Sequence, residues 1–134
     1  PTFLTSLLFG LVSQIRIRYP QSPLSRGRAG HVKGGDRLPF VPLAEGSNFD
    51  ALRAARAQLH VYGTPAPDVL TWTTEHAAVE LKVFPFSHAA DEAGLREGAV
   101  YLVRPDGYVS LAMPHFTPAE LEDMLRDGWG WHGI

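Results

Sequence analysis

The sequence of 134 residues predicts an α/β fold with a mixed sheet and flanking helices. Two apolar runs, residues 59–62 and 78–86, have the composition of buried strands and end at glycine or proline, and a helical pattern lies between them. A hairpin and a further helical pattern follow towards the C-terminus. Since a helix between two strands returns the chain to the same edge of a sheet, we expect parallel central strands.

An amphipathic helix is predicted over residues 1–17. Apolar side chains recur there at three- and four-residue spacing: Phe3, Leu4, Leu7, Leu8, Leu11, Val12 and Ile15. The basic start and cleavage site of a secretory signal are missing, and the run is too short and too interrupted to cross a bilayer. Because the chain begins with Pro1 rather than Met, we expect a fragment whose first helix packs on a preceding body or on a second copy.

A linker that leads into the last domain is predicted over residues 18–46. Prolines interrupt any helix and glycines loosen the backbone there: Pro20, Pro23, Pro39 and Pro42, with Gly27, Gly30, Gly34 and Gly35. We expect a mobile loop over residues 25–35. Its basic side chains, Arg26, Arg28 and Lys33, are interpreted as solvated rather than as a phosphate site.

The folded domain is expected over residues 47–134. Ser47 and Asp50 stand at capping-box spacing before a short helix over residues 51–56. The strand over residues 59–62 ends at a turn rich in glycine and proline, and a helix is predicted over residues 68–76.

The second predicted strand, residues 78–86, shows period-2 alternation. Val79, Leu81 and Val83 alternate with Glu80, Lys82 and Phe84 before Pro85 stops the strand. A small helix or loop is expected over residues 88–97.

A β-hairpin is predicted around the turn Arg104-Pro105-Asp106-Gly107. Val100 and Leu102 precede the turn, and Tyr108, Ser110 and Ala112 follow it, all at the period of two half-buried strands. The proline presets its φ angle, the aspartate can accept from the backbone ahead of it, and the glycine can take a left-handed conformation.

A final helix is predicted from the capping box of Thr117 and Glu120, with Pro118 at the first helical position. Leu121, Met124 and Leu125 are expected to face the sheet, and Gly128 to end the helix. The resulting order of strand, helix, strand, hairpin and helix is that of the thioredoxin-like fold.

Four stretches, in this order, resemble the end of the flavin-dependent aromatic hydroxylases of the phenol hydroxylase and polyketide hydroxylase type. They are Tyr19-Pro20-Gln21-Ser22-Pro23-Leu24, Gly35-Asp36-Arg37-Leu38-Pro39, Gln58-Leu59-His60-Val61-Tyr62-Gly63 and Arg104-Pro105-Asp106-Gly107-Tyr108. The resemblance implies that residues 1–17 are the last helix of a flavin domain, residues 18–46 a linker and residues 47–134 the thioredoxin-like last domain.

In that family the flavin of FAD, reduced by NAD(P)H, reacts with oxygen and hydroxylates an aromatic ring. The residues for this work lie in the preceding domains, so the resemblance implies no catalytic, cofactor-binding or metal-binding residue in this chain. It implies a role in packing, stability or oligomerisation, and a cytoplasmic location. The expected partner is the preceding flavin domain or, in a homodimer, a second copy of the chain. The contact is expected through Phe3, Leu7 and Leu11.

Thiol chemistry is excluded because the chain contains no cysteine. A thioredoxin-like fold would hold its dithiol in the turn at residues 62–67, which reads Tyr-Gly-Thr-Pro-Ala-Pro, and its cis-proline ahead of the hairpin, where Gly98 and Ala99 stand. We therefore predict a domain without redox activity.

Other chemistry finds little support in the residue spacing. The six histidines lack the spacing of metal ligands on one element: His31, His60, His76, His88, His115 and His132. The acids of the last helix, Glu120, Glu122, Asp123 and Asp127, are interpreted as structural. The net charge of −2 speaks against nucleic acid and anionic membranes as partners.

Two alternatives stay open at this point. Trp129, Trp131, Tyr101, Tyr108 and Phe116 are expected to pack in the core or at a domain interface, and a ligand platform is the sharper alternative. For the whole chain, the alternative to a hydroxylase domain is a stand-alone thioredoxin-like interaction module without catalysis.

Overall fold

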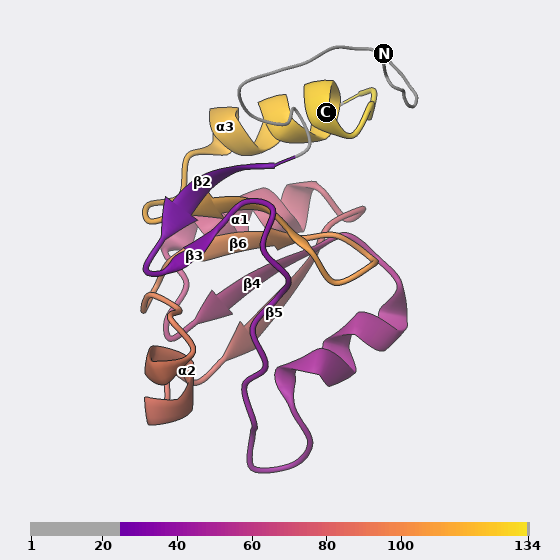
Figure 1. Cartoon of the computed structure of the whole chain (residues 1–134). Coiled ribbons are helices and arrows are strands. Elements are labelled where there is room, and N and C mark those ends of the chain that lie inside the picture. The colour runs from indigo at the N-terminus through magenta and orange to yellow at the C-terminus, as the bar shows by residue number, and fades with distance from the viewer. Residues whose placement is uncertain (1–24, 134) are drawn as a thin grey trace, which may run out of the picture.

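The computed structural model describes residues 25–133, which form a six-stranded mixed sheet with helices on both faces (Figure 1). The strands are β2 (Arg26–Ala29), β3 (Val32–Lys33), β4 (Gln58–Tyr62), β5 (Glu80–Phe84), β6 (Val100–Val103) and β7 (Val109–Met113). The helices are η1 (Asn48–Ala54), α1 (Pro67–Glu75), α2 (His88–Glu92), α3 (Pro118–Asp123) and η2 (Met124–Gly128). The predicted α/β class is confirmed, whereas the helix expected over residues 1–17 lies outside the described residues.

Four strands carry the predicted thioredoxin-like arrangement, in the order β7-β6-β4-β5. The central strand β4 pairs in parallel with β5, with Leu59 opposite Leu81, and α1 connects the two. On its other side β4 pairs antiparallel with β6, and β6 pairs antiparallel with β7. The predicted parallel pair and the antiparallel hairpin are therefore both present.

The prediction of a mobile loop over residues 25–35 is wrong, because β2 and β3 form a hairpin that extends the sheet. β2 pairs in parallel with β7, with Arg26 opposite Leu111, and Ala29 and Val32 are buried. Gly27 allows the backbone of β2 to approach that of β7, since a Cβ on Gly27 would lie 2.3 Å from the carbonyl oxygen of Ala112. The boundaries that the sequence places at residues 17 and 46 stay predictions.

Two layers of buried side chains cover the faces of the sheet. The layer on the side of η1 and α2 contains Tyr62, Tyr101 and Val109, and the layer on the side of α1 and α3 contains Leu59, Leu102 and Leu121 (Figure 1). Every residue of β6 and β7 is buried. The expectation of half-buried hairpin strands is therefore wrong, because helices cover both faces of the central sheet.

The hairpin turn has the predicted geometry. The N–H of Gly107 donates to the carbonyl of Arg104 at 2.9 Å, and Gly107 takes a φ of +90°. Asp106 Oδ1 accepts from the N–H of Tyr108 at 3.3 Å. Asp106 and Gly107 thus act as the sequence predicts.

The capping residues at the two predicted boxes behave differently. Ser47 and Asp50 form the reciprocal capping box, although the short helix that follows is a 3₁₀ helix. Thr117 does not cap α3, because its hydroxyl donates instead to the carbonyl of His115 at 3.4 Å. The burial of Leu121, predicted from helical spacing, is confirmed.

The alternation predicted for this strand holds in part, since Val79 is buried and Leu81 packs against the layer on the side of α1 and α3, but it fails at the end of β5. Phe84 is buried, and its ring stacks on Tyr62 with 5.0 Å between centroids, whereas the side chain of Val83 is 48% exposed. β5 is the edge strand, and the layer that holds Tyr62 covers Phe84. No helix of residues 25–133 is long and apolar enough to cross a membrane.

Candidate functional site

The turn between β4 and α1 occupies the place at which the thioredoxin-like fold holds its dithiol. The N–H of Gly63 donates to the carbonyl of Phe84 at 2.7 Å, and the N–H of Gly98 donates to the carbonyl of Tyr62 at 2.9 Å. Glu97 packs against the turn, since a Cβ on Gly63 would lie 3.1 Å from Glu97 Cγ. The turn is thus closed by backbone pairing and by a carboxylate side chain.

This turn does not fit the pyrophosphate of FAD. A dinucleotide site needs backbone N–H groups that point from a glycine-rich turn and a helix N-terminus at the phosphates. Pro65 and Pro67 have no N–H, and the N–H of Gly63 is already used. The carboxylate of Glu97 beside Gly63 would also repel an anion.

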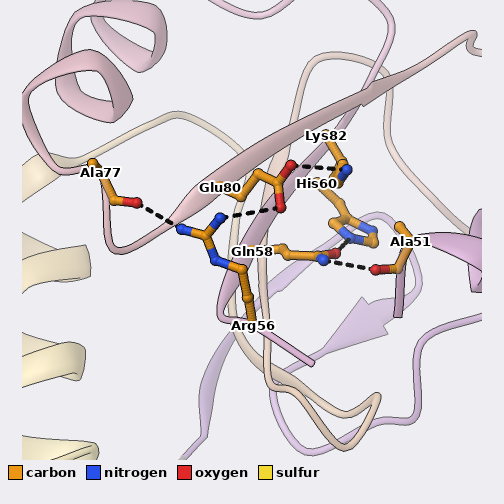
Figure 2. A network of polar contacts seen from close by, with 7 residues as sticks. All are labelled: Ala51, Arg56, Gln58, His60, Ala77, Glu80 and Lys82. Carbon is orange, nitrogen blue, oxygen red and sulfur yellow. Dashed lines mark hydrogen bonds and ion pairs between the residues drawn. The ribbon is translucent and has the colours of Figure 1, made fainter. Parts of the chain in front are cut away.

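A column of buried polar side chains lies on one face of β4. Gln58 and His60 are fully buried, as is Tyr62 two residues further. Gln58 Nε2 donates to the carbonyl of Ala51 at 2.7 Å, and its carboxamide oxygen lies 2.7 Å from His60 Nε2 (Figure 2). Because the Gln58 amide group is used as a donor, its oxygen accepts, and His60 carries its proton on Nε2.

Charged side chains lie beside this column, at the end of β5. Glu80 pairs with Lys82 at 3.0 Å and with Arg56 at 3.7 Å, and Arg56 also donates to the carbonyl of Ala77 at 2.7 Å (Figure 2). These groups are partly exposed, so the ion pairs add little to stability. They place the positive charge of Lys82 next to His60, its partner in the β4–β5 register.

His60 is a titratable group that the fold affects strongly. Burial, and then the charge of Lys82, lower its pKa from 6.5 to about 3. Its Nδ1 atom is buried and finds no hydrogen-bond partner among the described residues. From the residue spacing, His60 is expected to be an isolated histidine. The alternation of Gln58, His60 and Tyr62 in a buried strand is the signal that would have found this column.

Two buried tyrosines complete this side of the sheet. Asn48 Nδ2 donates to the hydroxyl of Tyr62 at 2.9 Å, and burial raises the pKa of Tyr62. The hydroxyl of Tyr101 donates to the carbonyl of Ala29 at 3.0 Å and accepts from the N–H of Arg96 at 2.9 Å, and burial raises its pKa as well. Both phenols therefore stay protonated at neutral pH and serve the structure: the Tyr62 hydroxyl accepts from Asn48, and the Tyr101 hydroxyl both donates and accepts.

Two of the stretches on which the resemblance rests meet in space, although 71 positions separate Arg37 from Tyr108. These two residues form a β-bridge. The guanidinium of Arg37 lies 5.2 Å from the ring centroid of Tyr108, and that of Arg104 lies 5.7 Å from it. Cation–π contact and backbone pairing thus join the start of the domain to its hairpin.

The aromatic side chains near the C-terminus take part in packing. Trp129 Nε1 donates to Ser110 Oγ at 2.9 Å, and Phe116, Trp129 and Trp131 pack half-buried against the layer under α3. Trp72 Nε1 donates to a carboxylate oxygen of Glu122 at 2.9 Å. This contact supports the structural interpretation of the acids in the last helix.

Within residues 25–133, no three side chains of histidine, aspartate or glutamate lie close enough together to hold a metal ion. His76 stacks on Trp72 with 4.0 Å between ring centroids, and His88 lies 3.2 Å from Glu92. The predicted partner residues Phe3, Leu7 and Leu11 lie outside the described residues.

Comparison with solved structures shows the same fold within two larger proteins. The rebeccamycin biosynthetic enzyme RebC, solved with reduced flavin, matches 81% of this chain with a TM-score of 0.59 and 21% identity. CabE, an aromatic hydroxylase from angucycline biosynthesis, matches 74% of the chain with a TM-score of 0.53 and 24% identity. The chain spans 22% of the length of each of these two proteins.

No curated protein matches the chain at a significant level. The family described as aromatic-ring hydroxylase, C-terminal, matches residues 31–131, which include the β3 strand, the polar column and the hairpin. With the thioredoxin-like strand order and the meeting of the Arg37 and Tyr108 stretches, this match shows that the chain belongs to the C-terminal domain family of the aromatic-ring hydroxylases.

Proposed function

We propose that the chain is the non-catalytic C-terminal domain of a FAD-dependent hydroxylase that uses NAD(P)H and acts on an aromatic ring. In this role it packs on the flavin domain and stabilises it, and residues 1–17 are the last helix of that domain. The observation that carries the proposal is the family match over residues 31–131, taken with the short share of RebC that the chain spans.

The chemistry of the described residues supports a structural role. The place of the dithiol holds Gly63-Thr64-Pro65-Ala66-Pro67, and its geometry does not fit a phosphate. The buried titratable groups, His60, Tyr62 and Tyr101, lie inside the packed layer under η1 and α2. Their buried positions favour a stabilising function over proton transfer to a substrate.

Titration of the 134-residue chain with FAD tests the non-catalytic assignment. We expect no quenching of flavin fluorescence up to a large excess of chain. Stoichiometric quenching would show that the chain itself holds the cofactor and would refute the assignment. A start codon at the position of Pro1 would instead favour the stand-alone interaction module.

A further inference from the structure

The hairpin of β2 and β3 presents a basic face without an acidic partner. Arg28 and Lys33 stand directly opposite each other in the antiparallel register, and both are exposed. Arg26 lies two residues before Arg28, so strand alternation puts it on the same face. We call these three residues the basic hairpin face.

This arrangement costs stability in isolation. Like charges directly opposite each other on neighbouring strands repel and destabilise the pairing. Within residues 25–133, no carboxylate forms an ion pair with Arg26, Arg28 or Lys33. The closest acid along the chain, Asp36, accepts instead from the backbone N–H of Lys33 at 3.0 Å.

The backbone of the hairpin is held in place, so the charges are fixed on it. A Cβ on Gly34 would lie 2.3 Å from the backbone nitrogen of Arg26, and a Cβ on Gly27 would lie 2.3 Å from the carbonyl oxygen of Ala112. On the opposite face, Ala29 and Val32 are buried. The basic hairpin face is therefore a presented surface rather than a mobile tail.

The distribution of acidic residues along the chain limits where a carboxylate partner for the basic hairpin face could lie. Residues 1–24 contain two arginines and no acidic residue, so they cannot neutralise the hairpin. Residues 26–37 hold four basic residues and one acid, whereas residues 38–134 hold six basic residues and thirteen acids. A carboxylate surface that pairs with the basic hairpin face would therefore lie outside residues 1–37.

We propose that the basic hairpin face docks on an acidic surface of the flavin domain that precedes this chain. β2 is the first described element after residues 1–24, and this continuity favours the preceding domain over a second copy. A surface that is joined through the chain also acts at high effective concentration. This inference rests on the proposed function.

Zero-length cross-linking of the full reading-frame product tests the contact. A carbodiimide activates a carboxylate, and a lysine amine within ion-pair distance displaces the urea to form an amide. Residues 1–134 contain two lysines, Lys33 and Lys82. Lys82 lies 3.0 Å from Glu80, so their product is an internal positive control.

We expect mass spectrometry to find Lys33 joined to a carboxylate of the preceding domain in the same chain. The yield should fall about tenfold in about 0.5 M sodium chloride, because salt screens exposed charges. Lys33→Arg should abolish the product and leave the fold unchanged. The double change Arg28→Glu and Lys33→Glu should raise hydrogen exchange of the hairpin amides, whereas Arg53→Glu with Arg96→Glu should not.

Two outcomes would overturn the contact. One is a Lys33 product only with residues 38–134 of a second copy, which would make the face a dimer contact. The other is the Lys82–Glu80 product without any Lys33 product. Failure of the proposed function is separate, because it would appear as a full reading-frame product that holds no FAD.

Discussion

The carboxamide oxygen of Gln58 lies 2.7 Å from Nε2 of His60, and both side chains are fully buried. This contact fixes the neutral tautomer of the histidine, because the Gln58 amide group already donates to Ala51. Protonation of Nδ1 would place a charge beside Lys82, in a packed layer that holds Tyr62, Phe84 and Tyr101. The fold therefore requires a neutral His60.

The first prediction is a loss of stability at acid pH. Since the pKa of His60 is lowered from 6.5 to about 3, the unfolded chain binds the proton more readily than the folded chain between these values. The free energy of unfolding should fall by about 1.4 kcal/mol for each pH unit below 6.5, down to about pH 3. Urea unfolding at pH 7.5, 5.5 and 4.5 measures this slope.

His60→Phe should flatten that slope by up to one proton. It should also lower stability at pH 7.5 by about 1–3 kcal/mol, because Gln58 loses its donor. His132→Gln, a change at an exposed histidine, should keep the original slope. An unchanged slope in His60→Phe would show that other groups cause the acid sensitivity.

The second prediction concerns Asn48, which joins three segments. Its side chain accepts from the N–H of Val41 at 2.8 Å and donates to the carbonyl of Pro39 at 2.8 Å, besides its bond to Tyr62. Asn48→Ala should cost about 2–4 kcal/mol, because it leaves buried groups without partners. Tyr62→Phe, which removes only one bond, should cost about 1 kcal/mol. Equal losses in denaturant unfolding would contradict this account.

The third prediction compares two glycines, one needed for close backbone packing and a positive φ angle and the other for its positive φ angle alone. Gly27 and Gly98 both have positive φ angles, of +86° and +78°. A Cβ on Gly27 would meet the backbone of Ala112, whereas a Cβ on Gly98 would find no atom within 4 Å. Gly98→Ala should cost about 1–2 kcal/mol, and Gly27→Ala about 3 kcal/mol or more. Thermal unfolding compares the two, and a cheaper change at Gly27 would argue against the close pairing of β2 with β7.

The fourth prediction tests the structural role of the acids in the last helix. Glu122→Ala should cost about 1–2 kcal/mol and alter tryptophan fluorescence, because the indole of Trp72 loses its acceptor. Glu122→Gln keeps an acceptor oxygen and should cost less than about 1 kcal/mol. Glu120→Ala, at an exposed position, should stay within about 0.5 kcal/mol of the parent. Equal losses with Gln and with Ala would show that the negative charge, and not the acceptor oxygen alone, stabilises the contact.

Most elements from η1 to α3 follow from the sequence because they have strong local signals, whereas the segment of α2 was expected as a small helix or loop. The capping box of Ser47, Pro67 at the start of α1 and the turn residues before Gly107 act over a few positions and are read directly. The order of these elements predicted the thioredoxin-like topology, and the family stretches agreed with it.

The β2–β3 hairpin and the polar column depend on contacts far along the chain. Glycines that read as flexible, such as Gly27, are needed where β2 approaches β7, and that approach is visible only in the fold. His60 and Gln58 read as ordinary polar residues, because their burial depends on η1 covering β4. Long-range packing outweighed local propensity at both places.

The content of the complete reading frame tests the central claim most directly. We predict that the frame upstream of Pro1 continues through a Gly-x-Gly-x-x-Gly strand–turn–helix, and that the purified product holds one FAD per chain, measured by flavin absorbance after release. A frame that starts at this point, or a longer product that holds no flavin, would contradict the assignment of this chain to a FAD-dependent hydroxylase.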